Sequence, residues 1–269
     1  MEKTKILFLA VAITLGPFPW FLPSIAEAHG PIVNCDIHGD PPHSDSLQAA
    51  INSAFPGGAL IQVTGTCNVN TIFIGGNQAN LTLDGQPPGA TTRATISSQT
   101  PPGTPLPNIN VVVNVNGASN VRIRNFIITG DGTSDGVNIV DGANVRLQNN
   151  IIQNAFREGV FVRSASARIF DNTIQNNGGD GIVVTESSAV RIGFSSTDDG
   201  IVRPNTIQDN VGNGISVLRS STARIVGNTS ISGNGGHGIS VFKASQADIA
   251  SNEISGNGGD GILSGRIPA

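Results

Sequence analysis

Residue types that commonly build binding sites are scarce in this 269-residue chain. It has no Tyr, one Trp and one Met, and aromatic residues make up 4% of the sequence. Sugar rings usually stack on Trp or Tyr, and the single Trp20 lies in the leader described below. We assign the Phe residues that follow the leader to the core and the corners of the fold.

Charge is also scarce, and its balance argues against a nucleic-acid partner. Charged residues make up 13% of the chain and the formal net charge is -4. The 34 Gly residues and the small charged fraction are unusual for a helix-rich domain. Frequent pairs of Ile and Val argue against disorder, which is the other interpretation of so much Gly and Asn.

The first 28 residues have the features of a cleavable signal peptide. Lys3 and Lys5 precede an apolar run over residues 6–15, and Ala26-Glu27-Ala28 fits the small-x-small pattern of signal peptidase sites. We therefore expect a mature chain that begins near His29, in a protein that is secreted to the extracellular space or the periplasm.

A membrane-anchoring helix is the alternative interpretation of this leader. Pro17, Pro19 and Pro23 interrupt its apolar stretch and leave about ten continuous residues, too few to cross a bilayer. No later segment is apolar enough to do so, and we expect no integral membrane segment after cleavage.

The segment 29–57 is expected to form an N-terminal cap. Two isolated cysteines make a poor zinc site, and their even number in an exported chain favours a disulfide between Cys35 and Cys67. Residues 45–54 predict one short amphipathic helix with Asp45 or Ser44 as its N-cap.

A repeat of about 23 residues dominates the rest of the chain. Each copy carries Val-Arg-hydrophobic, then Asn-x-Ile, then Gly-hydrophobic-x-hydrophobic. The shared glycines are spaced by 22 to 24 residues except across one insertion, and they are Gly136, Gly159, Gly181, Gly214, Gly238 and Gly261. The apolar segments are too short for helices, so each copy predicts a coil of three short strands that pair in parallel with the next coil. A leucine-rich repeat has the same period but requires a Leu consensus that is missing here.

The pattern also predicts which side chains point into the coil. In two successive coils the expected inward residues are Val145, Leu147, Ile151, Val160 and Val162, then Ile169, Ile174, Ile182 and Val184. The insertion from Gly193 to Pro204 is expected to project from a corner as the most specific loop.

With these motifs the chain resembles the right-handed parallel β-helix repeat family of the pectin-lyase-like superfamily. The match is best over 120–265, and Leu47 to Cys67 is similar to the capping element of such proteins. The resemblance implies an all-β fold, a single-stranded right-handed parallel β-helix over 58–269 behind a short capping helix. It leaves function open, because the superfamily holds lyases, hydrolases, epimerases, phage tailspikes and adhesins.

One column of arginines recurs between two inward hydrophobic positions. It is formed by Arg122, Arg146, Arg168, Arg191 and Arg224, and Asp248 takes the sixth place. Guanidinium groups at strand spacing repel one another unless they splay, pair with carboxylates or meet an anionic partner. The column is either a solvated face that resists edge-to-edge aggregation or a binding site for a linear anionic polymer such as a uronan.

A second column lies immediately before the repeated glycine. It holds Asp135, Glu158, Asp180, Asn213, His237 and Asp260. Stacked carboxylates tend to share a cation or to raise one another's pKa, so Asp135, Glu158 and Asp180, with Asp131, are candidate calcium ligands. The first three and His237 are also the catalytic candidates, because enzymes of the superfamily assemble such sites. Asp-Gly and Asn-Gly are ordinary turn dipeptides as well, and this interpretation needs no chemistry.

Two hypotheses about function remain. The first is a secreted, non-catalytic scaffold that contacts anionic or neutral polysaccharide outside the cell or at its surface. The second is a polysaccharide lyase, epimerase or glycoside hydrolase that acts beside the acidic column, with calcium as the possible cofactor. The regular repeat favours the first, since an active site usually interrupts the pattern. No helix or polar cap follows the last Gly-Ile-Leu strand of the sequence. We therefore expect that the chain is part of a longer protein, that a further chain or domain covers the last coil, or that residues 266–268 fold over it.

Overall fold

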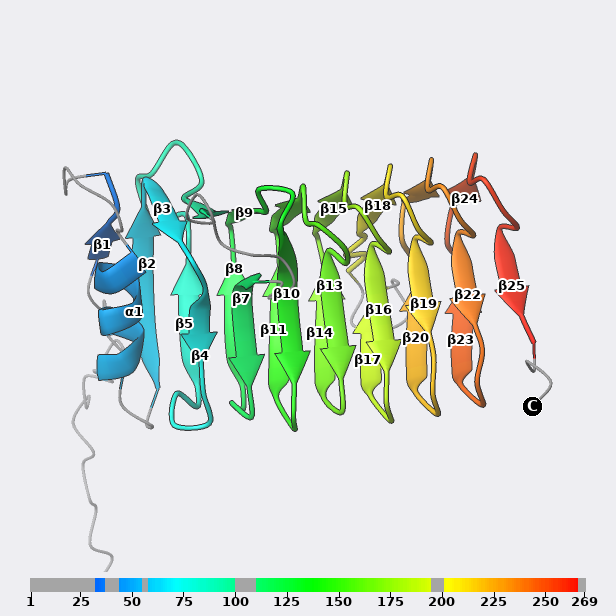
Figure 1. The fold of residues 1–269 in the computed structure, drawn as a ribbon, viewed down its shortest axis with the longest axis horizontal. Helices are drawn as coiled ribbons and strands as arrows, with labels where there is room; N and C mark the ends of the chain where they lie inside the picture. Colours follow the sequence, from blue (N-terminus) through cyan, green and yellow to red (C-terminus); the bar gives the residue numbers. More distant parts are fainter. Residues whose placement is uncertain (1–31, 37–43, 55–57, 100–109, 195–200, 266–269) are drawn as a thin grey trace, which may run out of the picture.

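A computed structural model describes residues 32–36, 44–54, 58–99, 110–194 and 201–265. The predicted signal peptide lies outside these residues. Three parallel sheets run the length of the described chain, and Figure 1 shows their coils stacked from the N-terminal end, where the helix lies, to the last strand. The expected all-β fold is confirmed.

We name the three sheets A, B and C, and each coil contributes one strand to each sheet in this order. Sheet A contains β1 (Ile32–Asn34), β2 (Ala59–Thr64), β5 (Leu81–Asp84), β8 (Val121–Arg124), β11 (Asn144–Gln148), β14 (Ser166–Phe170), β17 (Ala189–Ile192), β20 (Thr222–Val226) and β23 (Gln246–Ala250). Sheet B contains β3 (Thr66–Val69), β6 (Thr95–Ser98), β9 (Ile127–Thr129), β12 (Ile151–Gln153), β15 (Thr173–Gln175), β18 (Thr206–Gln208), β21 (Ser230–Ser232) and β24 (Ile254–Ser255). Sheet C contains β4 (Ile72–Ile74), β7 (Asn110–Asn116), β10 (Ser134–Val140), β13 (Val160–Arg163), β16 (Ile182–Thr185), β19 (Ile215–Val217), β22 (Ile239–Val241) and β25 (Ile262–Ser264).

Alternate side chains of every strand fill the interior of the coils. Leu147 pairs with Ile169 in sheet A, and Val162 pairs with Val184 in sheet C, so like residues stack through the core. Eight of the nine inward residues expected above are buried, but Ile151 is wrong. Its neighbour Ile152 is fully buried instead, because the residue two positions after the corner asparagine is the one that turns inward.

The helix closes the N-terminal end of the core. It spans α1 (Ser44–Ser53) and buries Leu47 and Ile51 completely. The Gln48 side chain accepts a hydrogen bond from the Phe73 N–H and donates one to the Phe73 carbonyl, both at 2.8 Å. An amide side chain thus satisfies backbone groups that the edge strand β4 presents where no further strand pairs with it. The side chains of Ser44 and Asp45, the predicted caps, lie outside the described residues.

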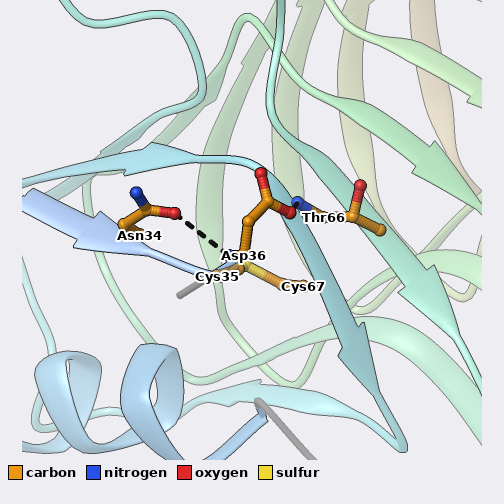
Figure 2. Close-up of a disulfide and its surroundings, with 5 residues drawn as sticks. All are labelled: Asn34, Cys35, Asp36, Thr66 and Cys67. Carbon is orange, nitrogen blue, oxygen red and sulfur yellow. Dashed lines mark hydrogen bonds between the residues drawn. A yellow bond between two sulfur atoms is a disulfide. The ribbon is translucent and has the colours of Figure 1, made fainter. Parts of the chain in front are cut away.

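The predicted disulfide joins Cys35 to Cys67 and ties the strand before the helix to sheet B. The Cα atoms are 5.0 Å apart and both side chains are buried. Figure 2 shows Asp36 beside the bond, where its side chain accepts a hydrogen bond from the Thr66 N–H at 2.8 Å. The strand β1, which pairs with β2, was not expected from the sequence.

A column of buried asparagines fixes the corner between sheets A and B. Each side-chain oxygen accepts the backbone N–H of its counterpart one coil earlier at 2.9 to 3.1 Å, through Asn150, Asn172, Asn205, Asn228 and Asn252. The amide nitrogen of each donates to a sheet A carbonyl of the preceding coil, as Asn172 does to Leu147 at 3.0 Å. The asparagine of the repeated Asn-x-Ile motif is therefore the residue that forms this ladder.

A second asparagine ladder fixes the corner between sheets B and C. It runs through Asn177, Asn210, Asn234 and Asn257 with the same bond pattern, and Ala155 donates its N–H to Asn177 at its start. The sequence interpretation missed it, although each of these residues stands four positions before a repeated glycine.

In the last coil, side chains equivalent to core residues are partly exposed. Ile249 and Ile254 are half-buried, whereas Ile225 and Ile231 one coil earlier are fully buried. A chain or domain that covers this coil stays a prediction. Within the described ranges, no helix is long and apolar enough to span a bilayer.

Removing the disulfide should lower the free energy of unfolding. The bond closes a loop with a sequence separation of 32 residues. In the chain-entropy model such a loop stabilises the fold by about 3 to 4 kcal/mol. We expect the double variant Cys35→Ala/Cys67→Ala to lose about this much in chemical denaturation. A loss below about 1 kcal/mol would contradict the model.

Removing one member of the first ladder should also be costly. In Asn205→Ala, the buried N–H of Asn172 loses its acceptor, and the carbonyl of Ile169 keeps the N–H of Gly193 but loses its second donor. One unsatisfied buried N–H predicts a loss of about 1 to 3 kcal/mol in unfolding free energy. Asn144→Ala is the matched control, because the Asn144 side chain is exposed and donates to Ser166 Oγ, and the change should cost less than about 1 kcal/mol. Equal losses of unfolding free energy in the two variants would show that a ladder asparagine contributes no more to stability than an exposed one.

Candidate functional site

The predicted arginine column exists and lies on the outer face of sheet A. Arg146 pairs in register with Arg122 on one side and with Arg168 on the other. Arg191 and Arg224 continue the row, and Asp248 ends it. The strands place the arginines outward because the residues on either side of each point into the core.

The arginine column lines two neighbouring hollows in the surface. The larger has a volume of about 490 Å³ and is lined by Arg168, Arg191 and Arg224 together with Asn144, Ser166 and Thr222. The smaller, of about 220 Å³, is lined by Arg122, Arg146 and Arg168 with Asn120 and Asn144. Because Arg168 and Asn144 border both, the hollows form one groove along the coils, with small polar side chains beside the charges.

The charges in this groove are incompletely balanced. Arg224 donates to Asp248 at 3.0 Å, and Arg191 lies over the Phe194 ring at 4.2 Å. Among the residues that the structure describes, no carboxylate pairs with Arg122, Arg146 or Arg168. Burial, followed by the charges of Arg122 and Arg168, lowers the pKa of Arg146. The neighbouring arginines thus add to the effect of burial on the pKa of Arg146.

The base of the insertion borders this groove. Phe194 and Arg203 pair as an antiparallel bridge, and residues 195–200 between them lie outside the described chain. Phe170, an outward residue of β14 that is 1% exposed, packs edge-on against Phe194 with ring centroids 5.0 Å apart. Arg203 and Arg146 lie over the Phe170 ring at 5.4 and 5.9 Å. Sequence reasoning missed this cluster, whose only signal is a Phe where the preceding coil has Gln148.

The acidic column is also in register, but two of its carboxylates serve the fold. Asp135 is 1% exposed and accepts two hydrogen bonds from the Arg157 guanidinium, the shorter at 2.6 Å. Asp180 accepts the N–H of Asn213 and the hydroxyl of Ser216, both at 2.6 Å.

Asn213 and His237 have the same role further along the column. The side chain of Asn213 accepts the N–H of His237 at 2.6 Å, and Nδ1 of His237 accepts the N–H of Asp260 at 2.8 Å. Successive side chains of this column therefore hydrogen-bond the backbone of the next coil. His237 is one link of that chain, which matches its place in the repeat.

Glu158 differs from its neighbours. Burial, and then the charge of Asp135, raise the pKa of its carboxyl, which is 23% exposed and lies 3.6 Å from Arg157 Nε. Asp131, the other candidate calcium ligand, accepts hydrogen bonds from the N–H and the hydroxyl of Thr133. Across the described ranges, no three His, Cys, Asp or Glu side chains gather closely enough to hold a metal ion.

Comparisons with known proteins establish the family. The model for the right handed beta helix region matches residues 29–195 and 190–265, and the chain belongs to this family. No curated protein matches the sequence.

Several solved structures are similar to this chain at low identity. An alginate lyase from Paenibacillus sp. str. FPU-7 is 16% identical over 88% of this chain and 99% of the lyase, with a TM-score of 0.46. The mannuronan C-5 epimerase AlgE6 A-module of Azotobacter vinelandii is 17% identical over 86% and 79% of the two chains, with a TM-score of 0.47. PfbA, a surface adhesin of Streptococcus pneumoniae, is 11% identical over 86% and 93%, with a TM-score of 0.26. At these identities and TM-scores the similarity assigns no activity to this chain.

The raised pKa of Glu158 predicts a pH-dependent cost to stability. Between its ordinary pKa and the raised value, the folded state binds more protons than the unfolded state, so stability falls as the pH rises through this window. Glu158→Gln should therefore melt at a higher temperature than the wild type at pH 7 and at nearly the same temperature below about pH 4. Glu253→Gln, at an exposed position, is the control for removal of one negative charge. A difference between Glu158→Gln and wild type that does not change with pH would refute this account.

Proposed function

We propose that this protein is a secreted, non-catalytic scaffold that binds a linear anionic polysaccharide along the arginine column. The observation that carries the proposal is the in-register row of Arg122, Arg146 and Arg168 in a groove without a carboxylate of the described chain beside them. Bringing like charges together opposes folding, and a bound polyanion offsets that cost.

The geometry of the groove favours a polymer over a small anion. Paired strands are about 4.8 Å apart, so the guanidinium groups form a row with a regular spacing. Such a row suits a ligand whose negative charges recur along its length. Guanidinium groups bind carboxylates in a bidentate way, and a uronan carries one carboxylate on each sugar. Asn144 and Ser166 beside the row supply polar groups for sugar hydroxyls.

The roles of the acidic column support a binding function over catalysis. Asp135 is held by Arg157, and Asp180 and His237 accept backbone N–H groups of the next coil. A general acid or base must reach the reacting atoms, and these three side chains hold the coils together instead. Among the catalytic candidates of this column, Glu158 is the one with a carboxyl that is partly exposed and has a raised pKa.

Secretion agrees with the disulfide and the predicted leader. Disulfides persist in oxidising compartments such as the periplasm and the extracellular space. Polysaccharides of cell walls and matrices are present in the same compartments.

Binding to soluble polygalacturonate and alginate tests the proposal. The double variant Arg146→Ala/Arg168→Ala should bind at least about tenfold more weakly than the wild type, and wild-type affinity should fall as salt is added. Arg163→Ala/Arg219→Ala is the matched control, because it removes two exposed arginines outside the column. Equal weakening in the two double variants would point to non-specific charge attraction.

Assays of cleavage on the same polymers test the non-catalytic part. Incubation with and without calcium should give neither unsaturated products, nor new reducing ends, nor a change in uronate stereochemistry. Turnover by the wild type that is lost in Glu158→Gln would replace this proposal with the lyase, epimerase or hydrolase hypothesis.

A further inference from the structure

A second hollow lies at the corner between sheets B and C, away from the arginine column. Its volume of about 440 Å³ falls in the range of about 300 to 1,000 Å³ that is typical of ligand sites. Phe156 and Val211 border it from coils on either side of Gly178, and they are 42% and 70% exposed. Gly178 has no side chain to fill the space between them, and any Cβ there would meet the Phe156 carbonyl.

The rim of this hollow is polar and nearly free of charge. Asn154, Asn176 and Asp209 occupy the same position of successive coils, each with a positive φ between 54° and 56°, and their side chains are exposed. Among the described residues that line the hollow, none is Lys or Arg, and Asp209 is the one carboxylate. Within the described chain, the side chains of Asn176 and Asp209 have no hydrogen-bond partner. A ligand here meets an apolar ring, amides and a carboxylate, but no cation.

An amide-bearing face of sheet B continues from the rim. Gln175 donates to Gln153 at 3.1 Å, and Gln208 donates to Gln175 at 3.4 Å. These side chains extend the neutral hydrogen-bonding surface along the coils beyond the hollow.

The geometry points to a binding site for a neutral polysaccharide at this corner, separate from the proposed anionic site. The apolar face of a sugar ring packs on Phe156, and its hydroxyl groups bond with Asn154, Asn176 and Asp209. Phe156 lies at a corner, in agreement with the sequence analysis, and its ring is exposed there. Asp209 disfavours an anionic sugar here, and the arginine column gives no aromatic platform of this kind to a neutral one.

The experiment uses the full mature chain and three soluble neutral polysaccharides, namely galactan, glucomannan and xyloglucan, in affinity electrophoresis and calorimetry. The wild type should bind at least one of them with an affinity that is the same in low and high salt. Phe156→Ser should weaken this binding about tenfold or more. Phe73→Ser is the matched control, because Phe73 is 47% exposed on sheet C, and it should bind as the wild type does. Val211→Ser is a second variant of the hollow and should also bind more weakly.

A crossed comparison separates this site from the proposed function. Arg146→Ala/Arg168→Ala should keep its affinity for the neutral polysaccharide, and Phe156→Ser should keep the affinity of the wild type for polygalacturonate. Absence of binding to all three neutral polymers, or equal losses in Phe156→Ser and Phe73→Ser, overturns the inference. A dimer of the wild type in sedimentation that Phe156→Ser converts to a monomer also overturns it, since the hollow would then be a contact between copies of this chain.

Discussion

Two columns of buried asparagine amides hold the coils of this protein in register. At each of two corners one side chain completes the hydrogen bonds of the coil before it, as Asn205 does for Asn172 and Asn210 for Asn177. Asp171, which precedes Asn172, and Asn176, which precedes Asn177, both have a positive φ. That conformation turns the chain, and the ladder satisfies backbone groups that the turn would leave unpaired in the interior. The strands are short, so the corners fix their alignment.

This alignment carries over to the outside of the molecule. Because the corners fix the register, every outward position becomes a straight column, whether its chemistry is favourable or not. Arginines that repel one another are held side by side in sheet A, and burial, followed by the charges of Arg122 and Arg168, lowers the pKa of Arg146. Carboxylates are likewise stacked at the start of the sheet C strands, where burial, and then the charge of Asp135, raise the pKa of Glu158. Asp135 and Arg224 each have a partner of opposite charge in the next coil, whereas Arg122, Arg146 and Arg168 have none among the described residues.

The periodic part of the structure was predictable and the aperiodic part was not. Spacing alone gave the stacked coils and the row from Arg122 to Asp248, and cysteine usage gave the disulfide. Ile151 was misassigned because both residues after Asn150 are Ile, and apolar character cannot distinguish inward from outward at a corner. The Phe170 and Phe194 contact and the exposure of Phe156 depend on which side chains neighbouring coils offer, and no repeat encodes that.

The asparagine ladders also make the joint between coils nearly the same everywhere. Asn172 meets Asn205 across the insertion through the same bonds with which Asn205 meets Asn228. A coil taken out between two ladder positions leaves the flanking asparagines with identical partners, as does a coil added there. The fold can therefore be lengthened or shortened by whole coils. Each coil added or removed changes the number of charges along the outer face without changing their spacing.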